Sequence, residues 1–229
     1  MSPSLPRRGF LIGTAAAGMT AVASSPEPVQ AQPAPAAAPE PMQILSAAEA
    51  AFIGAVADAM IPADALSPSG SECGVVTYVD RQLAGAYGAG ARLYRAGPFR
   101  PSGPGQGYQL PLTPLEYFRA GIAAADEWCR KSRGKPFDAL APAERDDVLK
   151  AIEAGTAAFG GLASKPFFAA LLQIVMEGFF ADPVYGGNRD KASWRMIGYP
   201  GLPATYADKI DSFRGKRYEA EPQSIVDFS

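Results

Sequence analysis

The chain has 229 residues, of which 21 are basic and 23 acidic, and this near balance leaves no electrostatic footprint for nucleic acid. It contains no histidine and only two cysteines, which excludes His-dependent nucleophiles, the usual zinc sites, c-type haem attachment and all-cysteine iron–sulfur clusters. No glycine-rich nucleotide fingerprint occurs either, because "GPGQG" at 103–107 lies in a Pro/Gly loop. Catalysis by carboxylates or by a lysine survives these exclusions, but no spacing singles out a pair.

The N-terminus predicts an export signal over residues 1–31. Arg7 and Arg8 precede a weakly apolar run that is shorter than the roughly 20 residues of a membrane span, and small residues precede the expected cleavage point. The stretch "RRGFL" resembles the bacterial twin-arginine signal, although Pro6 and Ile12 depart from its usual Ser or Thr and Lys. The alternatives are an ordinary signal peptide or a cytoplasmic tail. We expect export of an already folded chain, because the twin-arginine route carries folded proteins.

The remainder divides into three expected parts. Residues 32–42 are rich in Pro and Ala and predict a stiff, extended linker. A helical domain is expected over 43–205, followed by a C-terminal extension over 206–229. The mature chain is long enough to bury a core, and nothing after residue 31 is apolar for long enough to span a bilayer.

Two capping boxes mark the first helices. Ser46 with Glu49 begins a helix that Pro62 ends, and Thr113 with Glu116 begins another with proline at its first position. Between these two helices, "CGVVTYVDRQLAGAYG" predicts a helix with Val76, Val79, Leu83 and Tyr87 on one side. The stretch "RAGPFRPSGPGQGYQLP" predicts a long irregular loop before the third helix.

Two further helices are expected over 140–155 and from Lys165 to about Phe180, each with apolar residues at helical spacing. The second of them ends near Phe180 or Ala181, because Pro183 lacks an amide hydrogen and disfavours helix at Asp182. No alternating strand pattern of any length occurs. The sequence therefore predicts an all-α fold, an irregular or orthogonal bundle of about five to seven helices with long loops.

The two cysteines, Cys73 and Cys129, leave three possibilities open. An internal disulfide is the leading expectation, because an exported chain meets an oxidising compartment and the count is even. A bridge from one of them to a partner comes next, and two buried free thiols come last.

Four stretches in order resemble the gluconate 2-dehydrogenase subunit 3 family, over roughly residues 43–205. They are "ADAMIPAD" (57–64), "GVVTYVDRQLAGAYG" (74–88), "LTPLEYFRAGIAAAD" (112–126) and "EGFFADPVYGGNRDKASWRMIGYPG" (177–201). The resemblance implies a small subunit that accompanies a large FAD-binding dehydrogenase of the glucose–methanol–choline type, often with a c-type cytochrome. The family also carries twin-arginine signals, which implies that the small subunit escorts a flavin-loaded partner.

The segment 182–201 concentrates turn formers, aromatic residues and charges, and it is the candidate partner interface. Gly186 and Gly187 permit positive φ, and Asn188 can hydrogen-bond the local backbone. Aromatic residues mixed with arginine on ordered loops are typical of interface hot spots. The candidate contact residues are Asp182, Pro183, Tyr185, Gly186, Gly187, Asn188, Trp194, Arg195 and Tyr199. The alternative is that Trp194 and Tyr185 fill the chain's own core. We expect Trp194 to be half buried as an anchor, with Tyr185 and Arg195 facing the partner.

Together these observations predict a non-catalytic subunit without its own catalytic, cofactor or metal residues. FAD is expected in the partner and c-type haem in a third subunit. The expected location is the periplasm, associated with the inner membrane through the complex. Two alternatives remain: a free-standing exported enzyme that uses carboxylates such as Asp146 and Glu153, and a helical binding module for envelope polymers or small ligands.

Overall fold

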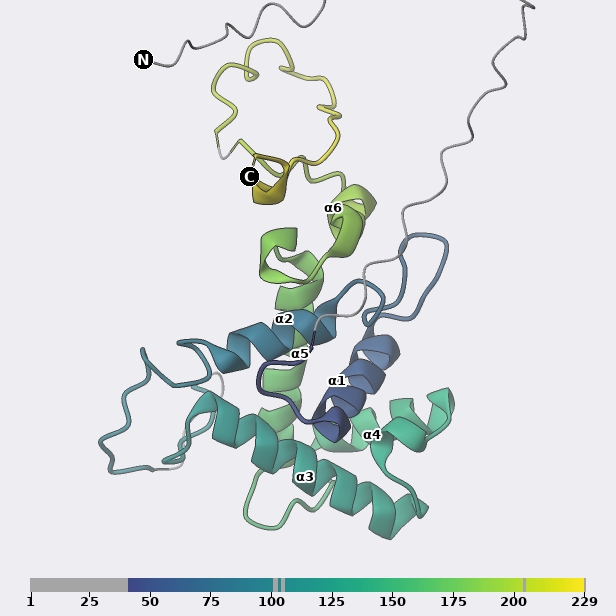
Figure 1. The fold of residues 1–229 in the computed structure, drawn as a ribbon, viewed down its shortest axis with the longest axis vertical. Coiled ribbons are helices and arrows are strands. Elements are labelled where there is room, and N and C mark those ends of the chain that lie inside the picture. The colour runs from purple at the N-terminus through teal and green to yellow at the C-terminus, as the bar shows by residue number, and fades with distance from the viewer. Residues whose placement is uncertain (1–40, 101–102, 104–105, 204, 229) are drawn as a thin grey trace, which may run out of the picture. The chain divides into compact units, whose positions relative to one another are not determined.

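The computed structural model describes residues 41–100, 103, 106–203 and 205–228, and these ranges form a helical domain (Figure 1). Within them no strand is present, only isolated bridges such as Gly201 with Gln223, so the predicted all-α fold is confirmed. The expected export signal, including Arg7 and Arg8, lies outside the described residues. The α-helices are α1 (Ala47–Met60), α2 (Val75–Ala84), α3 (Pro114–Arg133), α4 (Pro142–Ala154), α5 (Ser164–Phe180) and α6 (Ala192–Ile197). The short 3₁₀ helices are η1 (Phe137–Ala139), η2 (Pro183–Tyr185), η3 (Arg189–Lys191) and η4 (Ile225–Phe228).

Local capping explains where α1 and α3 begin. The predicted capping boxes form: the Glu49 amide donates to Ser46 Oγ over 3.2 Å, and the Ser46 amide donates to Glu49 Oε2 over 2.8 Å. Thr113 and Glu116 repeat the arrangement at α3. The fifth predicted helix also ends as expected, since α5 stops at Phe180.

The second predicted helix is shorter than its pattern indicated. It ends at Ala84, and Tyr87, expected on its apolar side, is half exposed in the turns that follow. The helix ends where Gly85 takes an extended conformation, and the chain then folds back so closely that a Cβ on Gly88 would lie 1.8 Å from the Leu83 carbonyl oxygen. The periodicity of the apolar residues therefore continued beyond the helix itself.

An aromatic cluster fills the centre of the bundle. Phe167 of α5 meets Tyr117 and Phe118 of α3 edge to face, with ring centroids 6.1 and 6.2 Å apart. Gly121 permits this approach, since a Cβ there would lie 2.1 Å from the Phe167 ring. Phe52 of α1 packs on Phe137 of η1, which joins α1 to the same core.

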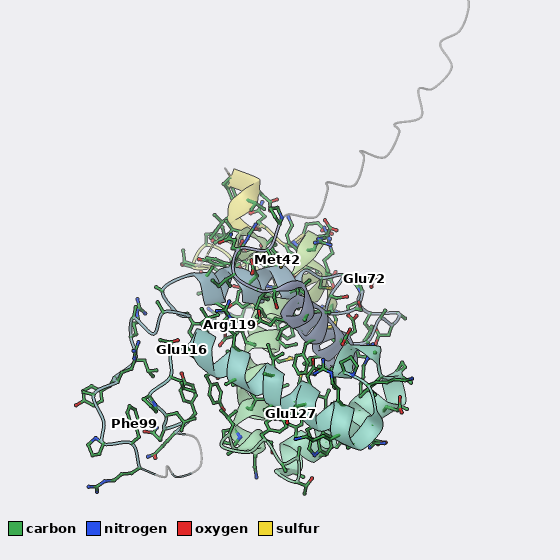
Figure 2. The ribbon with its side chains drawn as sticks, turned by 60° about the horizontal axis from the view of Figure 1, so that its bottom comes forward. Met42, Glu72, Phe99, Glu116, Arg119 and Glu127 are labelled. Carbon is green, nitrogen blue, oxygen red and sulfur yellow. The ribbon has the colours of Figure 1, made fainter. Side chains whose placement is uncertain are left out.

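A buried carboxylate holds the beginning of the domain. Asp80 of α2 is 2% exposed and accepts hydrogen bonds from the amides of Gln43, Ile44 and Leu45 at 2.7–3.0 Å. The Arg119 side chain donates to the Ile44 carbonyl over 2.8 Å, so α2 and α3 both bind the entering chain. Figure 2 shows Met42 and Arg119 on this side of the domain. The point at which the chain joins the bundle is therefore defined by its hydrogen bonds.

Candidate partner-binding site

The segment 182–201 folds into two turns and a short helix that follow the end of α5. Asp182 caps η2 by accepting the Val184 amide over 3.0 Å, and Gly186 then reverses the chain at a φ of 97°. A Cβ on Gly186 would lie 2.9 Å from Thr77 Cγ2, so both conformation and space require glycine there.

Gly187 serves a different purpose from the one that the sequence suggested. Its φ is not positive, and the expectation for this residue is corrected. A Cβ at Gly187 would lie 2.0 Å from the carbonyl oxygen of Gly178, so glycine is required by the close approach of this turn to α5.

Asn188 holds the turn from the inside. Its side chain is fully buried, its amide nitrogen donates to the Ala181 carbonyl over 2.9 Å, and its oxygen accepts both the amide and the hydroxyl of Ser193. Three residues other than glycine have positive φ here, namely Asn188 (45°), Asp190 (57°) and Lys191 (57°). Such backbone conformations are unfavourable for residues other than glycine, and they persist where surrounding contacts hold them.

Trp194 belongs to the chain's own interior. It is 6% exposed, its indole N–H donates to the Phe180 carbonyl over 2.9 Å, and Tyr199 meets its ring edge to face. The structure therefore supports the alternative for Trp194 that the sequence left open. The interface expectation is corrected for Gly187, Asn188 and Trp194, because all three are buried within the domain.

The outward side of the segment carries the remaining candidates. Tyr185 is 51% exposed and Tyr199 is 45% exposed, while Val184 and Ile197 add apolar surface. Arg195 is exposed, donates to the Asp190 carbonyl and pairs with Glu221 over 3.5 Å. These outward side chains provide the mixed aromatic, apolar and cationic surface typical of binding hot spots.

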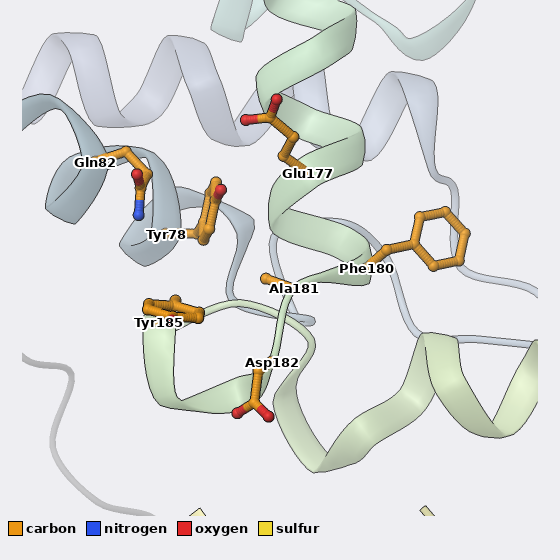
Figure 3. A pocket seen from close by; sticks show the side chains of 7 residues that line it. All are labelled: Tyr78, Gln82, Glu177, Phe180, Ala181, Asp182 and Tyr185. Carbon is orange, nitrogen blue, oxygen red and sulfur yellow. The ribbon is translucent and has the colours of Figure 1, made fainter. Parts of the chain in front are cut away.

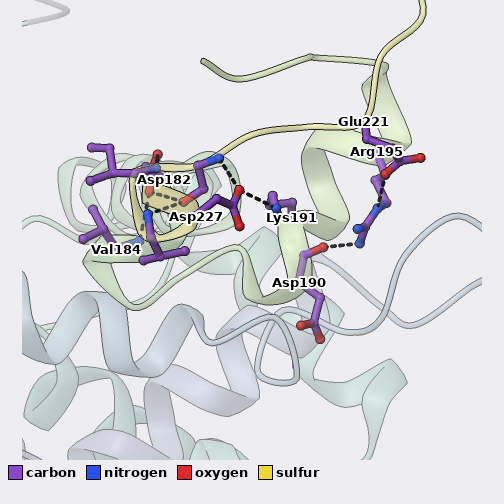
Figure 4. A network of polar contacts seen from close by, with 10 residues as sticks. Asp182, Val184, Asp190, Lys191, Arg195, Glu221 and Asp227 are labelled. Carbon is purple, nitrogen blue, oxygen red and sulfur yellow. Dashed lines mark hydrogen bonds and ion pairs between the residues drawn. The ribbon is translucent and has the colours of Figure 1, made fainter. Parts of the chain in front are cut away.

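The end of the chain returns to this segment, which the sequence did not indicate. Residues 223–228, here called the C-terminal strap, dock on Asp182, whose carboxylate accepts the Ser224 hydroxyl over 2.7 Å and the Ile225 amide over 3.1 Å. Asp227 accepts from the Ser224 amide and from Lys191 Nζ, each over 2.7 Å (Figure 4). Asp182 is thus a residue of the strap contact rather than a free interface group. The Ser-x-x-Asp spacing at 224–227 was the available local signal, since it is a capping pattern.

A shallow pocket lies where α2, α5 and η2 meet, with a volume of ≈ 470 Å³ (Figure 3). Its walls include Tyr78 and Gln82 of α2, Glu177 of α5 and the exposed Tyr185. Burial and then the negative charge of Glu177 raise the pKa of Tyr78 to about 12, so its hydroxyl stays protonated at neutral pH. The pocket offers hydrogen-bonding groups and two aromatic rings beside the outward face of 182–201.

Both cysteines are free thiols buried at separate places in the fold, so the expected internal bridge is not formed. The Cys73 thiol faces the Pro68 carbonyl over 3.6 Å, and Cys129 lies fully buried in α3. Burial raises the pKa of the Cys129 thiol to about 11, which keeps it protonated and unreactive. Of the three possibilities that the sequence left open, the structure has two buried free thiols.

The structure does not assemble the carboxylates considered for catalysis. Asp146 and Glu153 lie exposed on α4, and Asp146 pairs with Lys150 over 2.6 Å. In the described ranges, no group of three or more His, Cys, Asp or Glu side chains is placed to hold a metal ion. None of the helices that the structure describes is long and apolar enough to cross a membrane.

Fold and site together define an all-α protein in which a loop segment, held by buried hydrogen bonds, exposes aromatic and cationic side chains on its outward side. The chain matches the family model described as Gluconate 2-dehydrogenase subunit 3 over residues 47–201. This match covers more than half of the chain, which belongs to the gluconate 2-dehydrogenase subunit 3 family. The matched range contains all six α-helices of the described residues and ends at the Gly201 turn. No curated protein and no solved structure matches the chain.

Proposed function

We propose that the chain is a non-catalytic small subunit of a periplasmic, FAD-dependent sugar or sugar-acid dehydrogenase complex. The observation that carries the proposal is the family match over residues 47–201, whose name places the family among dehydrogenase subunits. In this role the chain binds a large flavoprotein of the glucose–methanol–choline type. It stabilises the complex and supplies the twin-arginine signal through which the folded partner is exported. We also propose that a c-type cytochrome is the third subunit and that it links the complex to the inner membrane.

The geometry of the loop segment supports a binding role. The backbone of 182–201 is held by buried groups, including Asn188 and Trp194, so the outward side chains are presented without a large ordering cost on binding. Tyr185 is the central candidate, because it is exposed beside the pocket and has no buried role.

Co-expression with the reading frames adjacent to the gene of this chain tests the proposal. We expect the tagged mature chain to co-purify with a partner that contains flavin and has dehydrogenase activity. Truncation of Tyr185 to alanine should weaken the complex by roughly thirtyfold, the effect of a hot-spot residue worth about 2 kcal/mol. Leu66→Ala is the matched control, since Leu66 is 71% exposed on a loop outside this segment. A wild-type chain that is stable alone and never binds the flavoprotein would contradict the proposal.

A further inference from the structure

A long loop between α2 and α3 projects from the helices, and we call its described residues, 85–100, 103 and 106–112, the arm (Figures 1 and 2). Its base is held firmly. The Leu115 amide donates to the Gly88 carbonyl over 3.2 Å, and the Tyr108 ring stacks on buried Tyr117 with a centroid distance of 3.8 Å. The first half of the arm is a run of hydrogen-bonded turns, as in the bond from the Ala91 amide to the Ala86 carbonyl over 3.0 Å. The arm therefore has a defined base and a first half built of turns.

The arm exposes large apolar and aromatic side chains. Tyr94 is 81% exposed, and Tyr87, Leu93 and Phe99 are each more than one third exposed. Figure 2 shows Phe99 on the part of the arm away from the helices. Exposed rings gathered on one projection, outside the core, are the kind of surface that proteins use for contacts.

The charge of the arm has a single sign. No Asp or Glu occurs between Asp80 and Glu116, whereas Arg92, Arg95 and Arg100 are all exposed. Hydrogen bonds from Thr113 and then the charge of Arg95 lower the pKa of the Glu116 carboxyl. Among the described residues, Arg92 and Arg100 have no carboxylate within ion-pair distance. The arm thus carries uncompensated positive charge on a chain whose net charge is negative.

A pocket lies at the base of the arm, with a volume of ≈ 420 Å³ and walls that include Tyr87, Leu93, Pro114 and Arg92. Apolar walls with one arginine suit a partner's apolar side chain next to a carboxylate. Burial and then the negative charge of Glu177, which lines the pocket beside Tyr185, raise the pKa of Tyr87.

We propose that the arm binds an acidic surface of the flavoprotein partner, with Arg92 and Arg100 pairing with its carboxylates and the exposed rings covering apolar area between them. The inference rests on the proposed function and names a second contact surface for the same partner. Arginine rather than lysine fits this role, because the guanidinium binds carboxylates through two parallel hydrogen bonds and is enriched at protein interfaces. The first lysine of the chain is Lys131, so the arm has none. Anionic lipid is the less favoured partner, because lipid-binding segments typically cluster about four to eight basic residues.

Charge reversal on the arm tests the inference in the assembled complex. The variant Arg92→Glu with Arg100→Glu should weaken binding of the purified flavoprotein by at least thirtyfold at low salt, and the remaining affinity should depend less on salt. The matched control is Lys135→Glu with Lys165→Glu, which changes the net charge equally on exposed residues. Lys135 follows the far end of α3, about 30 Å from the end that bears the arm, and its reversal should leave the affinity unchanged.

The outcomes separate the two proposals. Equal loss in the arm and control variants overturns the arm as a specific contact, as does an arm variant that binds like the wild type. Co-sedimentation with phosphatidylglycerol vesicles supplies a further readout: lipid binding that is lost in the arm variant while the complex is intact assigns the arm to the membrane instead. Thermal unfolding of the isolated variants should be unchanged, because the altered side chains are exposed. Failure of the wild-type chain to bind the flavoprotein contradicts the proposed function itself.

Discussion

Trp194 holds the α6 turn against the end of α5 through both its ring and its indole N–H. The ring also limits Gly201, where a Cβ would lie 2.8 Å from Trp194 Cζ3. A single side chain thus links α5, α6 and the turn that receives the C-terminal strap. Trp194 therefore stabilises the fold of this chain, and it affects partner binding only through that fold.

We expect Trp194→Ala to lower the free energy of unfolding of the isolated mature chain by about 3–5 kcal/mol, the usual cost of removing a buried large aromatic ring. Trp194→Phe keeps most of the ring but leaves the Phe180 carbonyl without its donor, and should cost about 1–3 kcal/mol. Urea unfolding measures both values. An unchanged stability combined with loss of the flavoprotein would instead place the indole at the partner interface.

Asp227 makes the strap contact sensitive to pH. Hydrogen bonds from Lys191 and then from the Ser224 amide hold the pKa of its carboxyl below the ordinary value of 3.8. A carboxyl whose pKa is lower in the folded chain stabilises it above the ordinary pKa, and that contribution is lost as the pH falls through the folded value. Limited proteolysis of 205–222 should therefore accelerate below about pH 4 in the wild type. In Asp227→Asn cleavage should already be fast near neutral pH, and a strap equally protected in both chains would contradict this account.

The loop segment 182–201 depends on close approach between elements as much as on turn conformation. Gly186 and Gly187 are neighbours in sequence, but the first is required by its positive φ and the second by the Gly178 carbonyl of α5. Packing of this turn on α5 is what positions Tyr185 beside the pocket. The segment is therefore an extension of the core rather than an independent loop.

Two glycine substitutions separate these requirements. Gly187→Ala should destabilise the chain by about 3 kcal/mol, because its Cβ meets backbone at 2.0 Å and that backbone cannot turn aside. Gly198→Ala is the comparison, since Gly198 has a φ of 68° with open space around it, and should cost only about 1 kcal/mol of conformational strain. Thermal unfolding of the two variants measures the difference. Equal costs would show that the turn yields where it packs against α5.

At the scale of the whole molecule, one buried core carries two exposed surfaces, the arm and the outward side of 182–201. Asp80 binds the amides at the beginning of the domain, and Asp182 binds the C-terminal strap at the other end of the sequence. Between them, the arm and the outward side of 182–201 face solvent with exposed rings and arginines. This arrangement suits a subunit that folds by itself and contacts a larger partner through projecting segments.

The proposed export role predicts a result that depends on the entire complex. Replacement of Arg7 and Arg8 by lysine should leave both the chain and the dehydrogenase activity in the cytoplasm, because a partner without its own signal travels with this chain. Cell fractionation with an activity assay measures it. The control is Arg214→Lys with Arg217→Lys, the same chemical change on exposed residues near the C-terminus. Dehydrogenase activity at normal levels in the periplasm of the Arg7 and Arg8 variant would rule out the escort role.

The sequence alone determined where α1 and α3 begin and where α5 ends, because these signals are local. The Ser46 and Thr113 capping boxes, and Pro183 after α5, act within a few residues and appear in the structure where they were expected. The family was also readable, since its motif of Asp-Pro, Gly-Gly-Asn and Trp lies in one continuous stretch. Tertiary structure decided the burial of Trp194, the free cysteines, the role of Gly187 and the docking of the strap. Each of these depends on contacts between residues far apart in the chain, or on a close approach of two elements, which residue spacing does not encode.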